Sequence, residues 1–250
     1  MKLALLSDIH ANLQALEACL EHAKHHGATQ YALLGDLVGY GGDPAPVMDS
    51  ILRLAHGGAL VIQGNHDEMA LNPPINKKHL GEATADWTHA QLTSEHRQFL
   101  AALPLTLRFE ACLLVHASAD APKEWRYVDD ERSARASLNA ATVDPHVRYV
   151  FGGHVHHQTL YYKGGGQGLM AFQPTPGIPI PVPNNRQWIA TVGSVGQPRD
   201  GKPLAMYAMF DLAQSRLTFH RVAYDHATAA DAVRRAGLPE YFAKRLEDGR

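Results

Sequence analysis

Short apolar runs alternate with amphipathic stretches over the first third of the chain, the pattern of a parallel sheet with crossover helices. Residues 3–6 form an uninterrupted apolar run, as expected for a strand buried on both faces. Apolar residues then recur every three or four positions up to Gly27, which predicts a helix that ends there. Further strands are predicted at residues 31–34 and 60–62, with a helix that begins near Pro46 between them. Polar residues that follow these three strands are therefore expected to meet at one edge of a sheet.

The remainder of the chain is richer in strands. Residues 84–102 are predicted to be helical, with an interruption or second start at residues 94–95. Short strands are then expected at residues 105–109, 111–115, 149–151, 158–162, 188–192, 204–210 and 217–223. A last helix is expected over residues 227–236, followed by a charged tail. These elements predict one domain, residues 1–250, with the α/β fold of a four-layer α/β/β/α sandwich: two mixed sheets with helices outside.

A glycine- and proline-rich stretch, residues 164–185, does not fit regular structure within that domain. Its prolines remove backbone donors from a strand ladder, so we expect a loop or an excursion at a sheet edge. We favour a tolerated surface insertion. The alternative is a lid that faces the substrate, because long ordered loops in compact domains are often functional.

Composition narrows the possible partners and the compartment. The formal net charge is -2 and the pI is about 6.8, so no basic field holds a nucleic acid or an anionic membrane surface. The two cysteines, Cys19 and Cys112, fit buried thiols in a reducing cytoplasm and exclude a disulfide framework. The apolar start of the chain is too short for a signal peptide and is interrupted by Asp8 and His10. We expect a cytoplasmic protein without a membrane partner, and the sequence leaves its oligomeric state open.

Potential metal ligands end five of the predicted strands. The segments are Asp8-Ile9-His10, Gly35-Asp36, Gly64-Asn65-His66-Asp67, Val115-His116 and Gly153-His154-Val155-His156. A single histidine or aspartate at a strand end is more often a cap or a turn residue. Five such segments in one chain favour a shared site instead. Carboxylate, imidazole and amide ligands suit hard or borderline divalent ions, and a carboxylate can bridge two of them. The pattern therefore predicts a hydrolytic site with two metal ions.

Individual residues in these segments carry different weight. Asp8 and His10 lie two apart at a strand end and can point toward the same ion. Asp36 lies in the glycine-flanked turn GDLVGYG, where the backbone can approach an ion closely. Asn65 offers an amide oxygen, whereas His66 beside it is either a ligand or a group that faces the substrate.

Other histidines are assigned no role in the site. His22 and His26 have the spacing of a helical metal pair, but we favour a solvated helix end, where the negative pole of the helix accommodates histidines. His157 would point to the opposite face of a strand from its neighbour His156.

The order D-x-H, G-D, G-N-H-D, H and G-H-x-H resembles the calcineurin-like metallophosphoesterase superfamily from Asp8 to at least His156. The stretch VGSVGQPRDG at residues 192–201 and the last strand pair are similar to its small bacterial members. The resemblance implies one metal ion held by Asp8, His10 and His156, and a second held by Asn65, His116 and His154. It further implies a bridging Asp36, a catalytic His66, and an Asp67 that hydrogen-bonds and orients that imidazole.

The implied reaction is in-line hydrolysis of a phosphoester by a metal-bound hydroxide, without a phosphoenzyme, with two divalent ions as cofactors. We expect manganese, with iron, zinc, nickel and cobalt as alternatives, and a small phosphoester as substrate. Gly39-Tyr40 stands where the phosphoprotein phosphatases of the superfamily have Asp-Arg, and Asp67 where they have Glu. Because that arginine clamps a phosphate monoester, its absence favours phosphodiesters. The alternatives are a broad phosphomonoesterase, a phosphoprotein phosphatase and, from another class, a metal-supported protein-binding scaffold. Arg199 is either a replacement charge or part of a surface turn.

Overall fold

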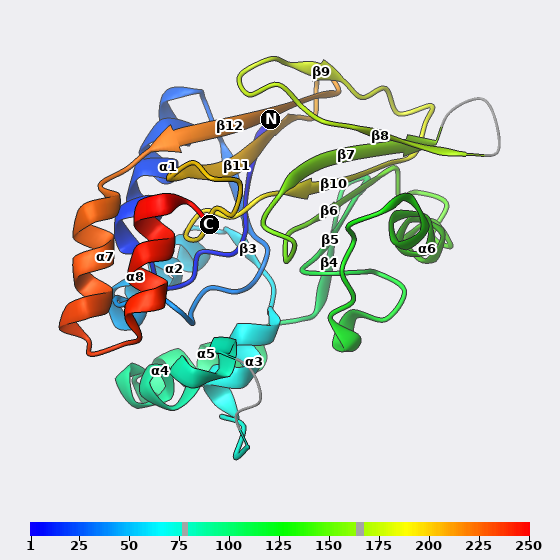
Figure 1. Cartoon of the computed structure of the whole chain (residues 1–250). Helices are drawn as coiled ribbons and strands as arrows, with labels where there is room; N and C mark the ends of the chain where they lie inside the picture. The colour runs from blue at the N-terminus through cyan, green and yellow to red at the C-terminus, as the bar shows by residue number, and fades with distance from the viewer. Residues whose placement is uncertain (77–79, 164–167) are drawn as a thin grey trace.

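Two mixed β-sheets pack face to face between layers of helices (Figure 1). The computed structural model describes residues 1–76, 80–163 and 168–250, and within them each sheet has six strands. The first sheet has the order β3-β2-β1-β11-β12-β9. Its strands are β1 (Lys2–Leu6), β2 (Gln30–Leu33), β3 (Leu60–Val61), β9 (Ile180–Pro181), β11 (Leu204–Asp211) and β12 (Arg216–Ala223). The strands β1, β2 and β3 are parallel, and the hairpin of β11 and β12 extends the sheet antiparallel to β1.

The second sheet has the order β4-β5-β6-β10-β7-β8. Its strands are β4 (Thr106–Phe109), β5 (Cys112–Val115), β6 (Tyr149–Gly152), β7 (Gln158–Lys163), β8 (Leu169–Phe172) and β10 (Trp188–Val192). The central strands β5, β6 and β10 are parallel, and the flanking pairs are antiparallel. The parallel centre of each sheet therefore presents its carboxyl ends to the same region of the molecule.

Eight α-helices lie in the described part of the chain. They are α1 (Leu13–His25), α2 (Pro44–His56), α3 (Asn65–Leu71), α4 (Ala85–Gln91), α5 (Ser94–Ala102), α6 (Glu131–Ala141), α7 (His226–Arg235) and α8 (Glu240–Asp248). Two short 3₁₀ turns, η1 (Leu80–Thr84) and η2 (Pro122–Glu124), precede α4 and α6. Figure 1 shows α1, α2, α7 and α8 on one outer side of the sandwich and α6 on the other. Among the described residues, no helix combines the length and the apolar composition that a membrane span requires.

The apolar core lies in layers that follow this arrangement. Between the sheets, Leu5, Leu114, Phe151 and Phe210 belong to one buried cluster. The outer face of the first sheet packs against α1 and α2, and the outer face of the second packs against α6. The uninterrupted run at residues 3–6 is buried because β1 has apolar neighbours on both faces. The expected α/β/β/α sandwich of two mixed sheets is confirmed.

Three helices of the structure differ from the elements that the sequence predicts. The expected charged tail is instead α8, whose Phe242, Ala243 and Leu246 pack on α7 while Glu240, Lys244 and Asp248 are exposed. Asn65 and His66 begin the helix α3, which the sequence pattern did not predict. Helix α6 is missing from the prediction, because its buried face is made mainly of small residues in a polar segment.

The stretch 164–185 is partly described, since residues 164–167 lie outside the described residues. The rest supplies an edge strand to each sheet, β8 and β9, as the expected edge excursion. Strand β9 pairs with Leu217 of β12. Leu217 pairs with Phe210 of β11, and Phe210 pairs in turn with Leu3 of β1. Strand β9 therefore lies toward the end of β1 opposite to Asp8, and the choice between a surface insertion and a substrate lid stays a prediction.

Candidate metal centre

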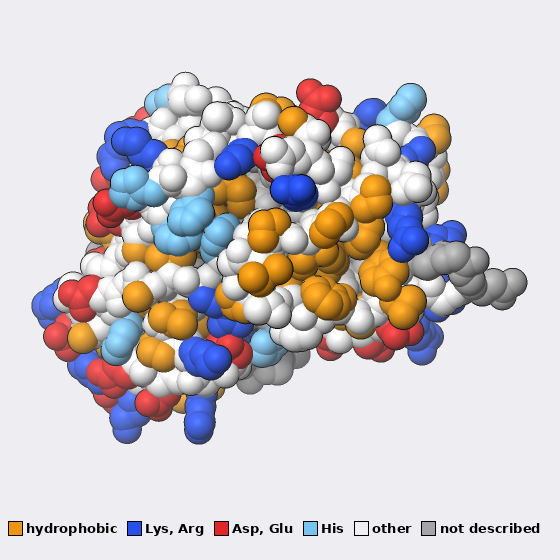
Figure 2. All heavy atoms as spheres, turned by 90° about the horizontal axis from the view of Figure 1, so that it is seen from above, with side chains coloured by type: hydrophobic (Ala, Val, Ile, Leu, Met, Phe, Trp, Pro, Cys, Tyr) orange, Lys and Arg blue, Asp and Glu red, His pale blue; other side chains and the backbone are white. Residues whose placement is uncertain are grey.

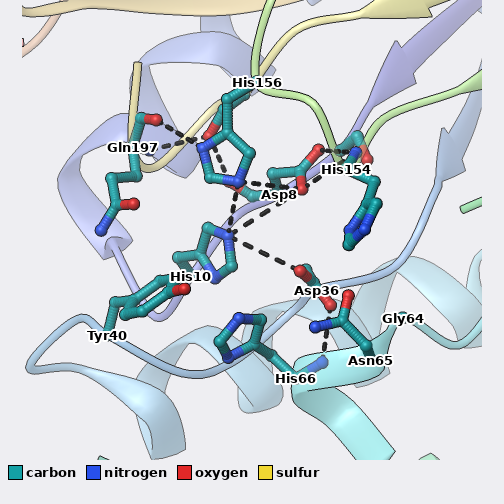
Figure 3. Close-up of polar contacts among 12 residues, drawn as sticks. Asp8, His10, Asp36, Tyr40, Gly64, Asn65, His66, His154, His156 and Gln197 are labelled. Atoms are coloured by element: carbon teal, nitrogen blue, oxygen red, sulfur yellow. Dashed lines mark hydrogen bonds and ion pairs between the residues drawn. The ribbon is translucent and has the colours of Figure 1, made fainter. Parts of the chain in front are cut away.

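The seven predicted metal ligands lie together at the joint between the two sheets. Figure 3 labels all of them except His116. The first sheet supplies four of them beyond the carboxyl ends of its parallel strands: Asp8, His10, Asp36 and Asn65. The second sheet supplies three after its parallel strands β5 and β6: His116, His154 and His156. All are buried except the half-buried Asn65. Each sheet alone would therefore hold an incomplete ligand set.

The backbone around these side chains is left-handed. Positive φ angles occur at Asp8 (53°), His10 (49°), Asp36 (51°), His154 (67°) and His156 (58°). Such a conformation costs about 1–3 kcal/mol at a residue other than glycine, and it clusters at functional sites. Hydrogen bonds from the Asp8 amide to the Gly35 carbonyl (3.0 Å) and from the His10 amide to the Asp36 carbonyl (2.9 Å) hold the two strand ends in place. The backbone is thus locally strained where it turns these side chains toward one point.

Gly153 allows the two sheets to meet at the site. A Cβ atom at this position would lie 1.9 Å from the Ser7 hydroxyl oxygen and 2.3 Å from Asp8 Oδ2. The next residue, His154, donates its backbone N–H to Asp8 Oδ2 at 2.9 Å. The glycine of the G-H-x-H segment therefore serves the close approach of β6 to the end of β1.

One group of ligand atoms comes from Asp8, His10 and His156. The Nδ1 atoms of His10 and His156 lie 3.3 Å and 2.7 Å from the carbonyl oxygens of Val38 and Gln197. A carbonyl can only accept, so each Nδ1 carries the proton and each Nε2 presents a lone pair. These two Nε2 atoms are 3.1 Å apart, and His156 Nε2 lies 3.3 Å from Asp8 Oδ1.

Two facing lone pairs repel each other unless a cation lies between them. Nitrogen–metal bonds of about 2.1 Å that meet at 90–110° separate the two nitrogens by about 3.0–3.4 Å. The separation of His10 Nε2 and His156 Nε2 falls in this range. These residues therefore fit a divalent ion.

A second group of acceptors surrounds His116. Its Nδ1 donates to the Leu34 carbonyl at 2.8 Å, and its Nε2 lies 3.2 Å from Asn65 Oδ1 and 3.4 Å from Asp36 Oδ2. His154 completes the group, and its buried Nε2 has no hydrogen-bond partner among the described residues. A buried polar atom without a partner is costly, and a metal ion would satisfy it.

Asp36 lies between the two groups. Its Oδ2 is 3.7 Å from His10 Nε2 and 3.4 Å from His116 Nε2, while its Oδ1 accepts the backbone N–H of His66 at 2.8 Å. Burial raises the pKa of this carboxyl group, but His116 and His66 outweigh burial and hold the pKa well below its usual value. A carboxylate that stays ionised between two sets of ligands has the position of a bridge.

His66 approaches the same space from the first turn of α3. Its ring lies 5.0 Å from the His10 ring and 4.3 Å from the Tyr40 ring, centroid to centroid. Gly39 has a φ of 89°, and a Cβ there would lie 2.8 Å from His66 Nδ1, so glycine leaves room for the imidazole. Burial lowers the pKa of His66 to about 4, which leaves the imidazole neutral in the free protein.

Asp67 differs from the sequence-based expectation. Its Oδ1 accepts the backbone N–H groups of Leu37 (2.8 Å) and Val38 (3.2 Å), and its Oδ2 accepts that of Gly64 (2.9 Å). Among the described residues it makes no hydrogen bond to the His66 imidazole, so the expected direct contact is wrong. The physical reason is that three backbone donors, two from the turn after β2 and one at the start of α3, already occupy the carboxylate. Asp67 fixes the turn and the helix start that carry His66.

Several residues at the rim of the centre were not identified from the sequence. Trp125 and the half-exposed Tyr127 lie against ligand histidines: the Tyr127 ring stacks on His154 at 4.2 Å, and the Trp125 ring is 5.8 Å from His116. Both lie in an irregular segment, where no periodic pattern marked them. They add an aromatic surface beside one group of ligands.

Arg199 and Arg245 lie on the other side of the centre. Arg199 Nη2 donates to Gln197 Oε1 at 2.7 Å, and Arg245 Nη1 donates to the same atom at 3.2 Å. The Gln197 carbonyl accepts from His156, and the Arg199 guanidinium lies 6.0 Å from the centroid of the Tyr40 ring. Arg199 is thus half-buried beside the ligands and is not part of a fully exposed turn. Arg245 was missed because the segment that became α8 was expected to be a tail.

Comparisons with known proteins agree with this architecture. The family model of the calcineurin-like phosphoesterase superfamily domain matches residues 1–215. A metallophosphoesterase from Sphaerobacter thermophilus has a similar structure, with a TM-score of 0.88 and 33% identity over 100% of this chain and 99% of that one. The uncharacterized protein MJ0912 of Methanocaldococcus jannaschii is 31% identical over 259 residues, which cover 99% of this chain and 98% of that protein. The protein PH1004 of Pyrococcus horikoshii OT3 shares the fold, with a TM-score of 0.76 and 21% identity over 100% and 98% of the two chains.

Proposed function

Since the chain belongs to the calcineurin-like phosphoesterase superfamily, a family of metal-dependent hydrolases, we propose that it hydrolyses small phosphoesters at two divalent ions and favours phosphodiesters. The proposed ligands of one ion are Asp8, His10 and His156, those of the other are Asn65, His116 and His154, and Asp36 is the proposed bridge. The observation that supports this most is the 3.1 Å contact between two Nε2 atoms whose protons are held elsewhere. We propose manganese as the native ion, with iron, zinc, nickel and cobalt as alternatives.

The residues around the ions have separate tasks in this proposal. A bound pair of divalent ions supplies Lewis acidity and activates a water nucleophile at neutral pH. A negatively charged phosphoryl group next to His66 favours its protonated form, which can then donate the proton to the leaving oxygen. Asp67 keeps His66 in place through the backbone of α3. Arg199 supplies positive charge near the phosphoryl group, and Tyr40 occupies the position where an arginine would clamp a monoester.

Chelation is expected to abolish hydrolysis of bis-nitrophenyl phosphate, because the ions would polarise the phosphoryl group and supply the nucleophile in this proposal. Manganese, cobalt, nickel or zinc should restore the rate better than magnesium does, since imidazole ligands favour softer ions. The measurement is the rate of nitrophenolate release together with the metal content of the same sample. Full activity in protein shown to hold no metal would exclude the proposed chemistry and leave the scaffold alternative.

We expect substrate preference to lie with diesters. The kcat/KM for bis-nitrophenyl phosphate should exceed that for mono-nitrophenyl phosphate and for a phosphoserine peptide by at least about tenfold, or about 1.4 kcal/mol in transition-state stabilisation. The two nitrophenyl esters share a leaving group, so their ratio reports on recognition of the phosphoryl group and not on leaving-group chemistry. A phosphoserine peptide that is turned over faster than every diester would support the phosphoprotein phosphatase alternative instead.

The location is also a proposal. Both cysteines, Cys19 and Cys112, are free and buried, and burial raises the pKa of the Cys112 thiol to about 12. Buried neutral thiols react slowly, and free thiols suit a reducing compartment. We propose the cytoplasm on this ground.

A further inference from the structure

A second histidine cluster lies away from the metal centre, on the helix-covered face of the first sheet. His22 and His26 are one turn apart at the end of α1, and His220 comes from the middle of β12. The ring centroids are 4.1 Å apart for His22 and His26, 5.1 Å for His22 and His220, and 5.0 Å for His26 and His220. Figure 2 shows histidine side chains gathered on this face of the molecule. His220 changes the interpretation of the helical pair, because β12 adds a third imidazole that the helix spacing alone did not reveal.

The contacts of the cluster orient two of the three rings. His26 Nδ1 lies 2.9 Å from the His22 carbonyl, which can only accept, so His26 Nε2 keeps its lone pair. His22 Nδ1 lies 2.8 Å from the Tyr207 hydroxyl, and the Tyr207 ring stacks on the His220 ring at 4.8 Å. An outer hydrogen bond on Nδ1 that leaves Nε2 with a lone pair, as in His26, is the usual arrangement of a metal-binding histidine.

We propose that His22, His26 and His220 form a third metal site, which binds a borderline divalent ion such as zinc through three imidazoles. One nitrogen from each residue lies within 4.8 Å of the other two. A tetrahedral zinc ion with bonds of about 2.0–2.1 Å requires a separation of about 3.4 Å, so small side-chain rotations would close the site. The absence of a carboxylate from this trio distinguishes it from the two-ion centre and disfavours magnesium and calcium.

The surroundings leave the fourth coordination position to a small ligand. The three histidines line a cavity of about 470 Å³, together with Lys2 and Arg216. Lys2 Nζ is engaged with the His26 carbonyl at 3.0 Å, so its charge is directed at the helix end. A metal ion in this position would have three protein ligands and one water or small anion, the arrangement of an open zinc site. Burial lowers the pKa of His220 to about 4, which keeps this imidazole neutral at pH 7.

The test is a count of zinc ions per chain, measured by elemental mass spectrometry after equilibration with zinc and removal of unbound metal. His26→Ala should bind one ion fewer than wild type, and so should His220→Ala. The matched control is His25→Ala, which removes an exposed histidine from the same helix end outside the cluster and should leave the count unchanged. Because His26 is exposed and His220 is buried, His26→Ala keeps the test valid if the His220 variant does not fold.

Asp36→Asn separates this site from the two-ion centre. It should lower the number of zinc ions bound at the two-ion centre and leave the ion that depends on His26 in place. The double variant with Asp36→Asn and His26→Ala should therefore bind one ion fewer than Asp36→Asn alone. The proposal is overturned if wild type and His26→Ala bind equal numbers of ions. It is also overturned if His25→Ala loses as much zinc as His26→Ala, because the binding would then be adventitious. Neither outcome depends on phosphoesterase activity.

Discussion

Replacement of His66 by alanine is expected to lower kcat by about 10²–10⁴ while the metal content stays near that of wild type. The reason is geometric: the imidazole stands beside His10 and Tyr40 at the edge of the centre, whereas the ligand contacts are made by its neighbour Asn65 and by residues on other segments. The measurement is kcat together with metal content for the same preparation. Asn65→Ala is the matched comparison, because it removes the adjacent side chain and should lose metal from one group.

A comparison of two leaving groups makes the test of His66 more specific. If His66 donates a proton to the leaving oxygen, its loss should matter little for a nitrophenolate ester and much more for an alkyl ester. The ratio of the two rate losses is therefore expected to exceed about tenfold, and it is insensitive to a uniform fall in active protein. Equal losses on both esters would make His66 a positioning residue, and loss of metal would make it a ligand.

Asp36→Asn is expected to weaken both ions together. One substitution removes the charge nearest to both His10 and His116 and leaves the size of the side chain almost unchanged. Loss of a supporting residue already costs a metal site about 10–100-fold in affinity, so loss of a bridging ligand should exceed that for each ion. His116→Ala should mainly affect one ion. Calorimetric titration of metal-free protein with manganese measures both affinities.

A thermal melt with and without manganese separates lost binding from lost folding. His116 and His66 favour the ionised Asp36 carboxylate even when no metal is bound, so Asp36→Asn should lower the metal-free Tm. The rise in Tm that manganese gives to wild type should be much reduced in the variant, since binding to the folded state is what produces it. Two ions bound at wild-type affinity by Asp36→Asn would show that Asp36 is not a bridge.

Much of the fold could be predicted because local pattern and tertiary environment agree. The run at residues 3–6 is apolar because β1 lies between two packed layers, and the polar Asp8 follows because the strand ends at the joint of the sheets. Such strands are bounded by abrupt changes from apolar to polar residues, and these changes can be recognised in a single sequence. The elements that were missed have no such boundary: α6 buries mostly small residues, and α8 hides a narrow apolar face among charges.

The same distinction applies to the candidate site, whose local motifs could be predicted and whose long-range contacts could not. Strand-end motifs identified the residues that the fold brings together, because motif residues and strand ends are both local features. The contacts of Asp67 with Leu37 and Val38, and the meeting of His220 with α1, join segments far apart in the chain. Nothing in a single sequence states such pairings. The expected Asp67–His66 contact was wrong because the nearest neighbour in sequence was not the nearest partner in space.

Gly153 has a consequence for any attempt to transplant this centre into another scaffold. A design that copied only the seven donor side chains would omit the residue that allows the two sheets to approach each other closely at the joint. With alanine there, the methyl group would lie 1.9 Å from the Ser7 hydroxyl oxygen, whereas Cβ contacts in proteins stay beyond 3.0 Å. The host sheets would have to separate by about an ångström, enough to pull ligands out of the range of metal–nitrogen bonds. A transplanted centre would therefore need the seven donor side chains and also a glycine at the position of Gly153.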